Sequence, residues 1–70
     1  MKAIRVEVSA REWDKVISFV AENDDDEILM VQTGRNSLLV VSEGECSMAR
    51  AKAMIYAHFE EETLITPLKR

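Results

Sequence analysis

The sequence predicts an α+β fold, because segments with strand periodicity alternate with segments of helix periodicity along the 70 residues. Residues 3–8 alternate apolar and polar side chains, which is the pattern of a strand with one buried side. Residues 9–22 and 42–62 instead repeat apolar residues with the period of an α-helix. Two short apolar runs, 28–31 and 38–41, separate the two helices and indicate further strands.

The first predicted helix follows the first strand directly. Ser9 and Glu12 have the spacing of a capping box, in which each side chain satisfies a backbone amide of the first turn. The helix is expected to run to about Glu22, with one apolar stripe formed by Trp13, Val16, Ile17 and Val20. Phe19 lies off this stripe, so it could cover the rim of the core or contact a partner.

The middle of the chain is predicted to form a β-hairpin. The runs 28–31 and 38–41 are too short for helices, and residues 33–36 between them are rich in types that tolerate positive φ, as in a hairpin turn. The last segment, 64–68, contains Pro67, which confines it to a sheet edge or a strand end.

The second predicted helix, roughly 42–62, is apolar on two sides. Ser42 and Glu45 form a second capping box, although Gly44 makes a start at Cys46 or Ser47 the rival. A stripe of mostly large side chains suits packing on a sheet: Met48, Ala51, Ile55 and Phe59. A stripe of small side chains suits close approach of a neighbouring helix: Cys46, Ala49, Ala53 and Ala57.

The order of elements is therefore strand, helix, strand, strand, helix, strand, and each half begins with an apolar strand, a Ser, two residues and a Glu. Two right-handed βαβ units joined by a hairpin form the ferredoxin-like βαββαβ sandwich. We expect one domain over residues 1–70, with both helices on one face of a four-stranded antiparallel sheet.

Composition limits the kinds of partner. Thirteen acidic residues against nine basic ones give a formal charge of -4, which disfavours direct binding of nucleic acid and favours a protein with a basic surface. The one cysteine excludes an internal disulfide and fits a reducing cytoplasm. No apolar run approaches the length of a membrane span, so we expect a cytoplasmic protein without membrane contact.

The hairpin strands are apolar in either register, so one side of them needs a cover. We expect a homodimer formed through the face or edge of the sheet, with docking on a different protein or a covering helix as alternatives. Which side faces inward stays open at this point. The residues expected at the dimer interface are Leu29, Val31, Leu39 and Val41.

An acidic run follows the first helix. It lacks the alternating oxygen ligands, the central Gly and the distal Glu of an EF-hand, so calcium binding is not expected. We assign it instead to contact with a basic partner. The residues expected to bind this partner are Glu22, Asp24, Asp25, Asp26, Glu27 and Phe19.

The sequence lacks the parts of an active site. Cys46 and His58 lie twelve residues apart on one helix, or about 18 Å, so His58 cannot activate the thiol within one chain. Cys46 is expected to be a small buried thiol, and His58 a solvated residue on the flank of the helix. His58 and Glu62 supply two ligands where a metal needs three or four. No Gly-rich loop precedes either helix, and we expect no enzyme, metal or cofactor.

These observations favour a non-catalytic binding module that docks on a macromolecular partner. Its most specific form is a phage or mobile-element inhibitor of the anti-CRISPR or anti-restriction type, whose carboxylates imitate phosphates. The alternative is a homodimeric regulatory or structural domain that binds a small ligand at the subunit interface. The least favoured hypothesis is an enzyme that combines Cys46 of one chain with His58 of another.

Overall fold

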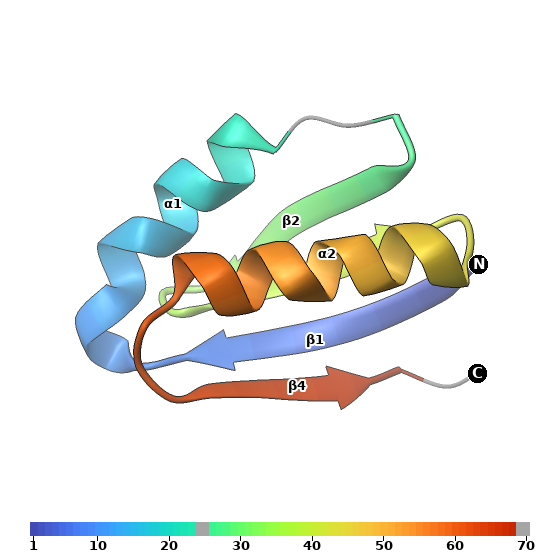
Figure 1. The fold of residues 1–70 in the computed structure, drawn as a ribbon. Coiled ribbons are helices and arrows are strands. Elements are labelled where there is room, and N and C mark those ends of the chain that lie inside the picture. Colours follow the sequence, from blue (N-terminus) through green and yellow to red (C-terminus); the bar gives the residue numbers. More distant parts are fainter. Residues whose placement is uncertain (24–25, 69–70) are drawn as a thin grey trace.

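The computed structural model describes residues 1–23 and 26–68 and has the predicted α+β composition (Figure 1). Both α-helices lie on the same side of one four-stranded antiparallel sheet. The start of β1 and the end of β4 lie at the same end of the sheet (Figure 1). In chain order the elements are β1 (Lys2–Val8), the 3-10 helix η1 (Ala10–Glu12), α1 (Trp13–Glu22), β2 (Ile28–Gly34), β3 (Ser37–Ser42), α2 (Glu45–His58) and β4 (Thr63–Pro67).

The strand order is β2-β3-β1-β4, and each neighbouring pair is antiparallel. Helix α1 therefore joins two parallel strands, β1 and β2, that have β3 between them. In the same way α2 joins β3 and β4, which have β1 between them. Strands β2 and β4 form the two edges, and Pro67 ends β4, so its predicted confinement to an edge or a strand end is confirmed.

The core lies between the sheet and the helices. Alternate residues of β1, β2 and β3 point inward, and the stripe of mostly large side chains on α2 covers them, as its spacing predicts. The buried side chains of the core are Ile4, Val6, Val8, Val16, Phe19, Ile28, Met30, Leu38, Val40, Met48, Ala51, Ile55 and Phe59.

Helix α1 is rotated relative to the sequence prediction. Ser9 caps η1, where its Oγ accepts from the Arg11 N–H at 3.3 Å, and α1 begins only at Trp13. The buried residues of α1 are Val16 and Phe19, while Trp13 and Ile17 are 39% and 51% exposed. Val16 is buried and Val20 packs against the core, as the predicted stripe requires. The stripe is wrong for Trp13 and Ile17, because Phe19 takes the inward position instead.

Phe19 is a core residue, which corrects its assignment to partner binding. It is 3% exposed and contacts the rings of His58 and Phe59, with centroid distances of 4.8 and 5.4 Å. His58 is partly buried by the same contact, so its predicted position on a solvated flank is wrong. This aromatic group joins the two helices at the end of α2.

The start of α2 also differs from the predicted capping box. The helix begins at Glu45 with Gly44 as its N-cap, between the two starts that the sequence suggested. Ser47 makes the capping contacts, since its Oγ accepts from the Gly44 N–H at 3.3 Å. Ser42 is the buried last residue of β3, and its Oγ donates to the Gly44 carbonyl at 3.0 Å.

The stripe of small residues on α2 faces solvent. Cys46 and the three alanines of this stripe are exposed, so the predicted helix neighbour and the predicted burial of Cys46 are both wrong. The reason is geometric: the stripe lies opposite the one that rests on the sheet, and α1 lies on the same side of the sheet as α2. The helices meet instead through Phe19.

The hairpin between β2 and β3 turns over Arg35 and Asn36. The turn residues tolerate positive φ, but positive φ is absent throughout the described chain, glycines included. A register shift between Gln32 and Gly34 supplies the extra residue, so the turn forms with ordinary backbone angles.

Glu12 is the buried acidic side chain of the described chain, with 3% of its surface exposed. Its carboxylate accepts from the backbone N–H groups of Glu60 at 3.2 Å and Glu61 at 3.0 Å, and it lies 3.0 Å from Lys15 Nζ. Burial raises the pKa of Glu12, but the hydrogen bonds from Lys15, Glu61 and Glu60 outweigh it, so the pKa lies below its ordinary value.

A lowered pKa makes Glu12 a source of acid sensitivity. Its contribution to stability is fully present above the ordinary Glu pKa of 4.5 and is lost as the pH falls through the lower folded pKa. We expect Glu12→Gln to reduce stability at neutral pH and to flatten the loss of stability below about pH 4.5. Urea unfolding across this range measures both. An unchanged pH profile in the variant would contradict the assignment.

The rotation of α1 predicts which of its side chains matters for stability. Phe19→Ala should lower the free energy of unfolding by about 3–5 kcal/mol, since it empties a buried aromatic site. Leu64→Ala, at a side chain that is 59% exposed, should cost less than about 1 kcal/mol. Urea unfolding of both variants checks the difference, and equal costs would place Phe19 outside the core.

Candidate functional site

The face of the sheet opposite the helices carries an exposed apolar patch, which we call the open-face patch: Leu29, Val31, Leu39 and Val41. Leu29 lies opposite Val41, and Val31 opposite Leu39, on the neighbouring strands β2 and β3. Leu29 is 60% exposed and Val31 is 45% exposed, while the other two are half-buried. The structure thus brings together the four residues expected at an interface. It also shows that this side of the two strands faces outward.

Strands β1 and β4 bound the open-face patch. Ala3 lies next to Val41 and extends the apolar surface, whereas Arg5 lies next to Leu39. Arg5 Nη2 is 3.3 Å from the Glu7 carboxylate, and both side chains are about half exposed. On the outer face, the apolar side chains of β2 and β3 are therefore followed by the charged pair of β1.

The predicted acidic residues lie at one end of the sheet. Glu22 ends α1, and Asp26 and Glu27 precede β2, all with exposed side chains. Glu27 Oε2 is 3.2 Å from Arg50 Nη2 of α2, so this carboxylate is partly neutralised. Asp24 and Asp25 lie outside the described residues.

Glu43 joins this acidic end, although it is not among the predicted site residues. Its backbone N–H donates to the Glu27 carbonyl at 3.3 Å, which continues the pairing of β2 and β3 beyond the strands. A weak indication of its position was present in the sequence. Glu43 lies just after the apolar run 38–41, which was predicted to pair with the strand that follows the acidic run. We call Glu22, Asp26, Glu27 and Glu43 the acidic end.

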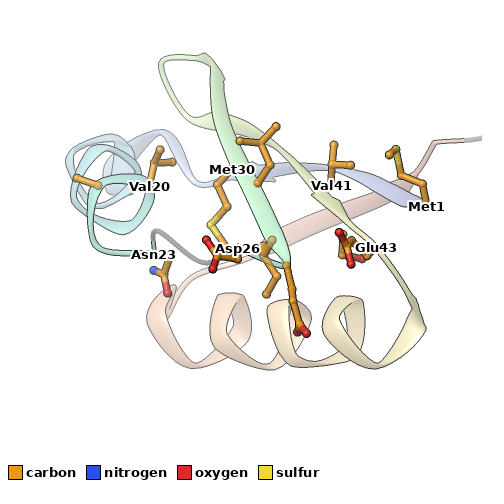
Figure 2. A pocket seen from close by; sticks show the side chains of 12 residues that line it. Met1, Val20, Asn23, Asp26, Met30, Val41 and Glu43 are labelled. Atoms are coloured by element: carbon orange, nitrogen blue, oxygen red, sulfur yellow. The ribbon is translucent and has the colours of Figure 1, made fainter.

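A hollow of about 430 Å³ lies where the acidic end meets the sheet (Figure 2). Val20 and Ala21 of α1 border it on one side, and residues 26–30 and 41–43 on the other. Figure 2 shows the carboxylates of Asp26 and Glu43 around it together with the apolar side chains of Met30 and Val41. Because Leu29 and Val41 also line it, the hollow connects the acidic end to the open-face patch.

The remaining reactive side chains do not come together. Cys46 is exposed near the start of α2 and His58 is its last residue, so their separation on one helix stands as the sequence predicts. The Nε2 atom of His58 is buried and has no hydrogen-bond partner in the described chain. Within residues 1–23 and 26–68, no three His, Cys, Asp or Glu side chains gather as a metal site would require.

No helix within the described ranges has the length and apolar character needed to cross a membrane. Comparison of the chain with protein-family models, with curated proteins and with solved structures found no match.

The exposure of Cys46 predicts its reactivity. The thiol should react with a disulfide reagent in the folded protein at a rate within about tenfold of that in urea, because no packing shields it. Stopped-flow absorbance of the released thiolate measures both rates. Strong protection in the folded state would show that a further contact covers this face of α2.

Proposed function

We propose that this chain is a non-catalytic binding module that docks on a protein partner with apolar side chains flanked by Lys and Arg. The observation that supports it is the continuous surface formed by the open-face patch, the hollow and the acidic end. Burial of Leu29 and Val31 would contribute roughly 1 kcal/mol or more each, because both begin largely exposed.

The acidic end would add selectivity and a faster association rate. Carboxylates at the rim of an interface attract basic partners over several ångströms, and this attraction weakens as salt rises. Glu22, Asp26 and Glu43 are all exposed, so they can meet such a partner without an initial rearrangement. An inhibitor of the anti-CRISPR or anti-restriction type, with carboxylates in place of phosphates, is the most specific form of this proposal.

We also infer that the fold is of the ferredoxin-like type. Two interleaved units support it: β1, α1 and β2 enclose β3, while β3, α2 and β4 enclose β1. This arrangement leaves one face of the sheet without helices, and the docking surface is part of that face.

A regulatory dimer that binds a small ligand between subunits is the second candidate. The hollow favours it, since its volume falls within the range of small-molecule sites and it lies beside the edge strand β2. A ligand that binds there would raise the melting temperature, with a dependence on ligand concentration.

The docking proposal is tested with a photo-crosslinking amino acid in place of Leu39, followed by purification of the crosslinked protein. With that partner in hand, the double variant Asp26→Asn, Glu43→Gln should weaken binding about three- to tenfold at low salt and much less at high salt. Calorimetry at two salt concentrations measures the change.

The matched control removes two carboxylates at the other end of the molecule. Glu60→Gln with Glu62→Gln changes the net charge equally but should leave affinity within about twofold. Leu39→Glu should abolish binding. Crosslinking to nucleic acid, or an affinity that is indifferent to Leu39→Glu, would overturn the proposal.

A further inference from the structure

Strand β2 is an edge strand without the usual protection. Within the described residues it pairs only with β3, and its seven residues, Ile28–Gly34, include no proline and no charged side chain. The opposite edge differs, because β4 ends in Pro67 and follows three consecutive glutamates. Natural sheets usually block exposed edges with proline or charge, since the backbone groups there can pair with another strand. The β2 edge is thus open to strand pairing.

Helix α1 carries exposed apolar side chains along the same edge, a stripe that we call the α1 stripe: Trp13, Ile17 and Ala21. The guanidinium of Arg35, which directly follows β2, lies 4.9 Å above the Trp13 ring. At the other end of the helix, Ala21 borders the hollow together with residues 28–30 of β2. One end of the α1 stripe therefore lies beside the turn that follows β2, and the other lies beside β2 itself. Ile17, which is 51% exposed, lies between these ends on the helix.

We propose that a second copy of this chain binds at the β2 edge, so that the two β2 strands pair antiparallel and the sheet continues across a two-fold axis. This arrangement covers the exposed strand edge and the α1 stripe of both copies at once. It needs no other partner, but it uses Asp26, Leu29 and Val31, which also belong to the docking surface proposed above.

The regular part of β2 fixes the register. Residues 28–32 pair without interruption with β3, and the register shift begins after Gln32. Centring the two-fold axis on Met30 pairs this whole stretch with itself: Ile28 opposite Gln32, and Leu29 opposite Val31 of the second copy. Opposed residues of antiparallel strands point to the same face, so the two sets of helices stay on one side and the open-face patches on the other.

The backbone groups needed for this pairing point outward. The Glu43 N–H donates to the Glu27 carbonyl, so the backbone groups of Glu27 point toward β3. Because the direction alternates along a strand, those of Leu29 and Val31 also point toward β3. Ile28, Met30 and Gln32 then direct theirs at the open edge. These are the residues that the register places in hydrogen-bonded pairs.

Charge also favours an antiparallel copy. Asp26 precedes β2 and Arg35 follows it. In the proposed register Asp26 lies opposite Gly34 of the second copy, which is the residue before Arg35. Asp26 of each copy is therefore close to Arg35 of the other, so this pair of opposite charges occurs twice. A parallel arrangement would place like charges together at each end.

Sedimentation equilibrium of the purified chain across a dilution series tests the proposal. Wild type should be a dimer at high concentration. Gln32→Pro should weaken it at least about tenfold, since proline removes an N–H directed at the edge and spares the pairing with β3. Gln32→Ala is the matched control, because it loses the same side-chain bond to the Gly34 carbonyl and keeps the N–H.

A second variant tests the dimer in case Gln32→Pro prevents folding. Ile17→Glu should also weaken the dimer about tenfold, while Tyr56→Glu, at an equally exposed helix position on α2, should not. Circular dichroism confirms that each variant is folded.

Charge reversal tests the register. Arg35→Glu and Asp26→Arg should each weaken the homodimer, and an equimolar mixture should restore association, because each junction then joins opposite charges. Arg35→Gln controls for loss of the contact with Trp13. A wild-type chain that is monomeric throughout, or a dimer broken by Leu39→Glu but not by Gln32→Pro or Ile17→Glu, would overturn the proposal.

Discussion

The arrangement of α1 depends on one buried carboxylate. Glu12 accepts hydrogen bonds from two consecutive backbone N–H groups of the loop between α2 and β4, so it ties the start of one helix to the end of the other. A buried charge is tolerated only when its oxygens are satisfied, and here two amides and Lys15 provide this. The requirement that Glu12 point inward sets the phase of the helix that follows it.

That phase determines both the core and the surface. With Glu12 inward, Val16 and Phe19 lie one and two turns further along the same side and enter the core. Val20 also packs against the core, whereas Trp13 and Ile17 point away from it. Helix α1 is therefore apolar on two sides, and the side away from the core lies beside the open edge of β2.

Periodicity predicted much of this fold, and the failures have a common cause. The strands, the α2 stripe over the sheet and the confinement of Pro67 follow from local patterns that packing did not alter. The phase of α1 could not be predicted, because it depends on Glu60 and Glu61, which are distant in sequence. Spacing alone could not separate Phe19, which is buried, from Ile17, which is exposed.

For the candidate site, the sequence predicted the residue types but not their arrangement in space. The two apolar strands required that one set of side chains face outward, but only the burial of Ile28 and Met30 shows that this set is Leu29 and Val31 on β2. The acidic run was visible as a charge pattern, whereas its contact with Glu43 depends on the pairing of β2 with β3. The hollow could not be predicted, since it forms where α1 ends beside a strand edge.

The proposed dimer and the proposed docking function are compatible, because pairing of the β2 edges leaves most of the open face accessible. In the proposed dimer, Leu29 and Val31 meet across the two-fold axis, while Leu39 and Val41 lie one strand further away in each copy. The two open-face patches then form one apolar surface, with an acidic end at each side of it. A partner with two matching sites would bind the second at a high effective concentration, so weak contacts with one chain would become strong contacts with the dimer. Self-association would in this way set the affinity of docking without adding a new contact to the partner.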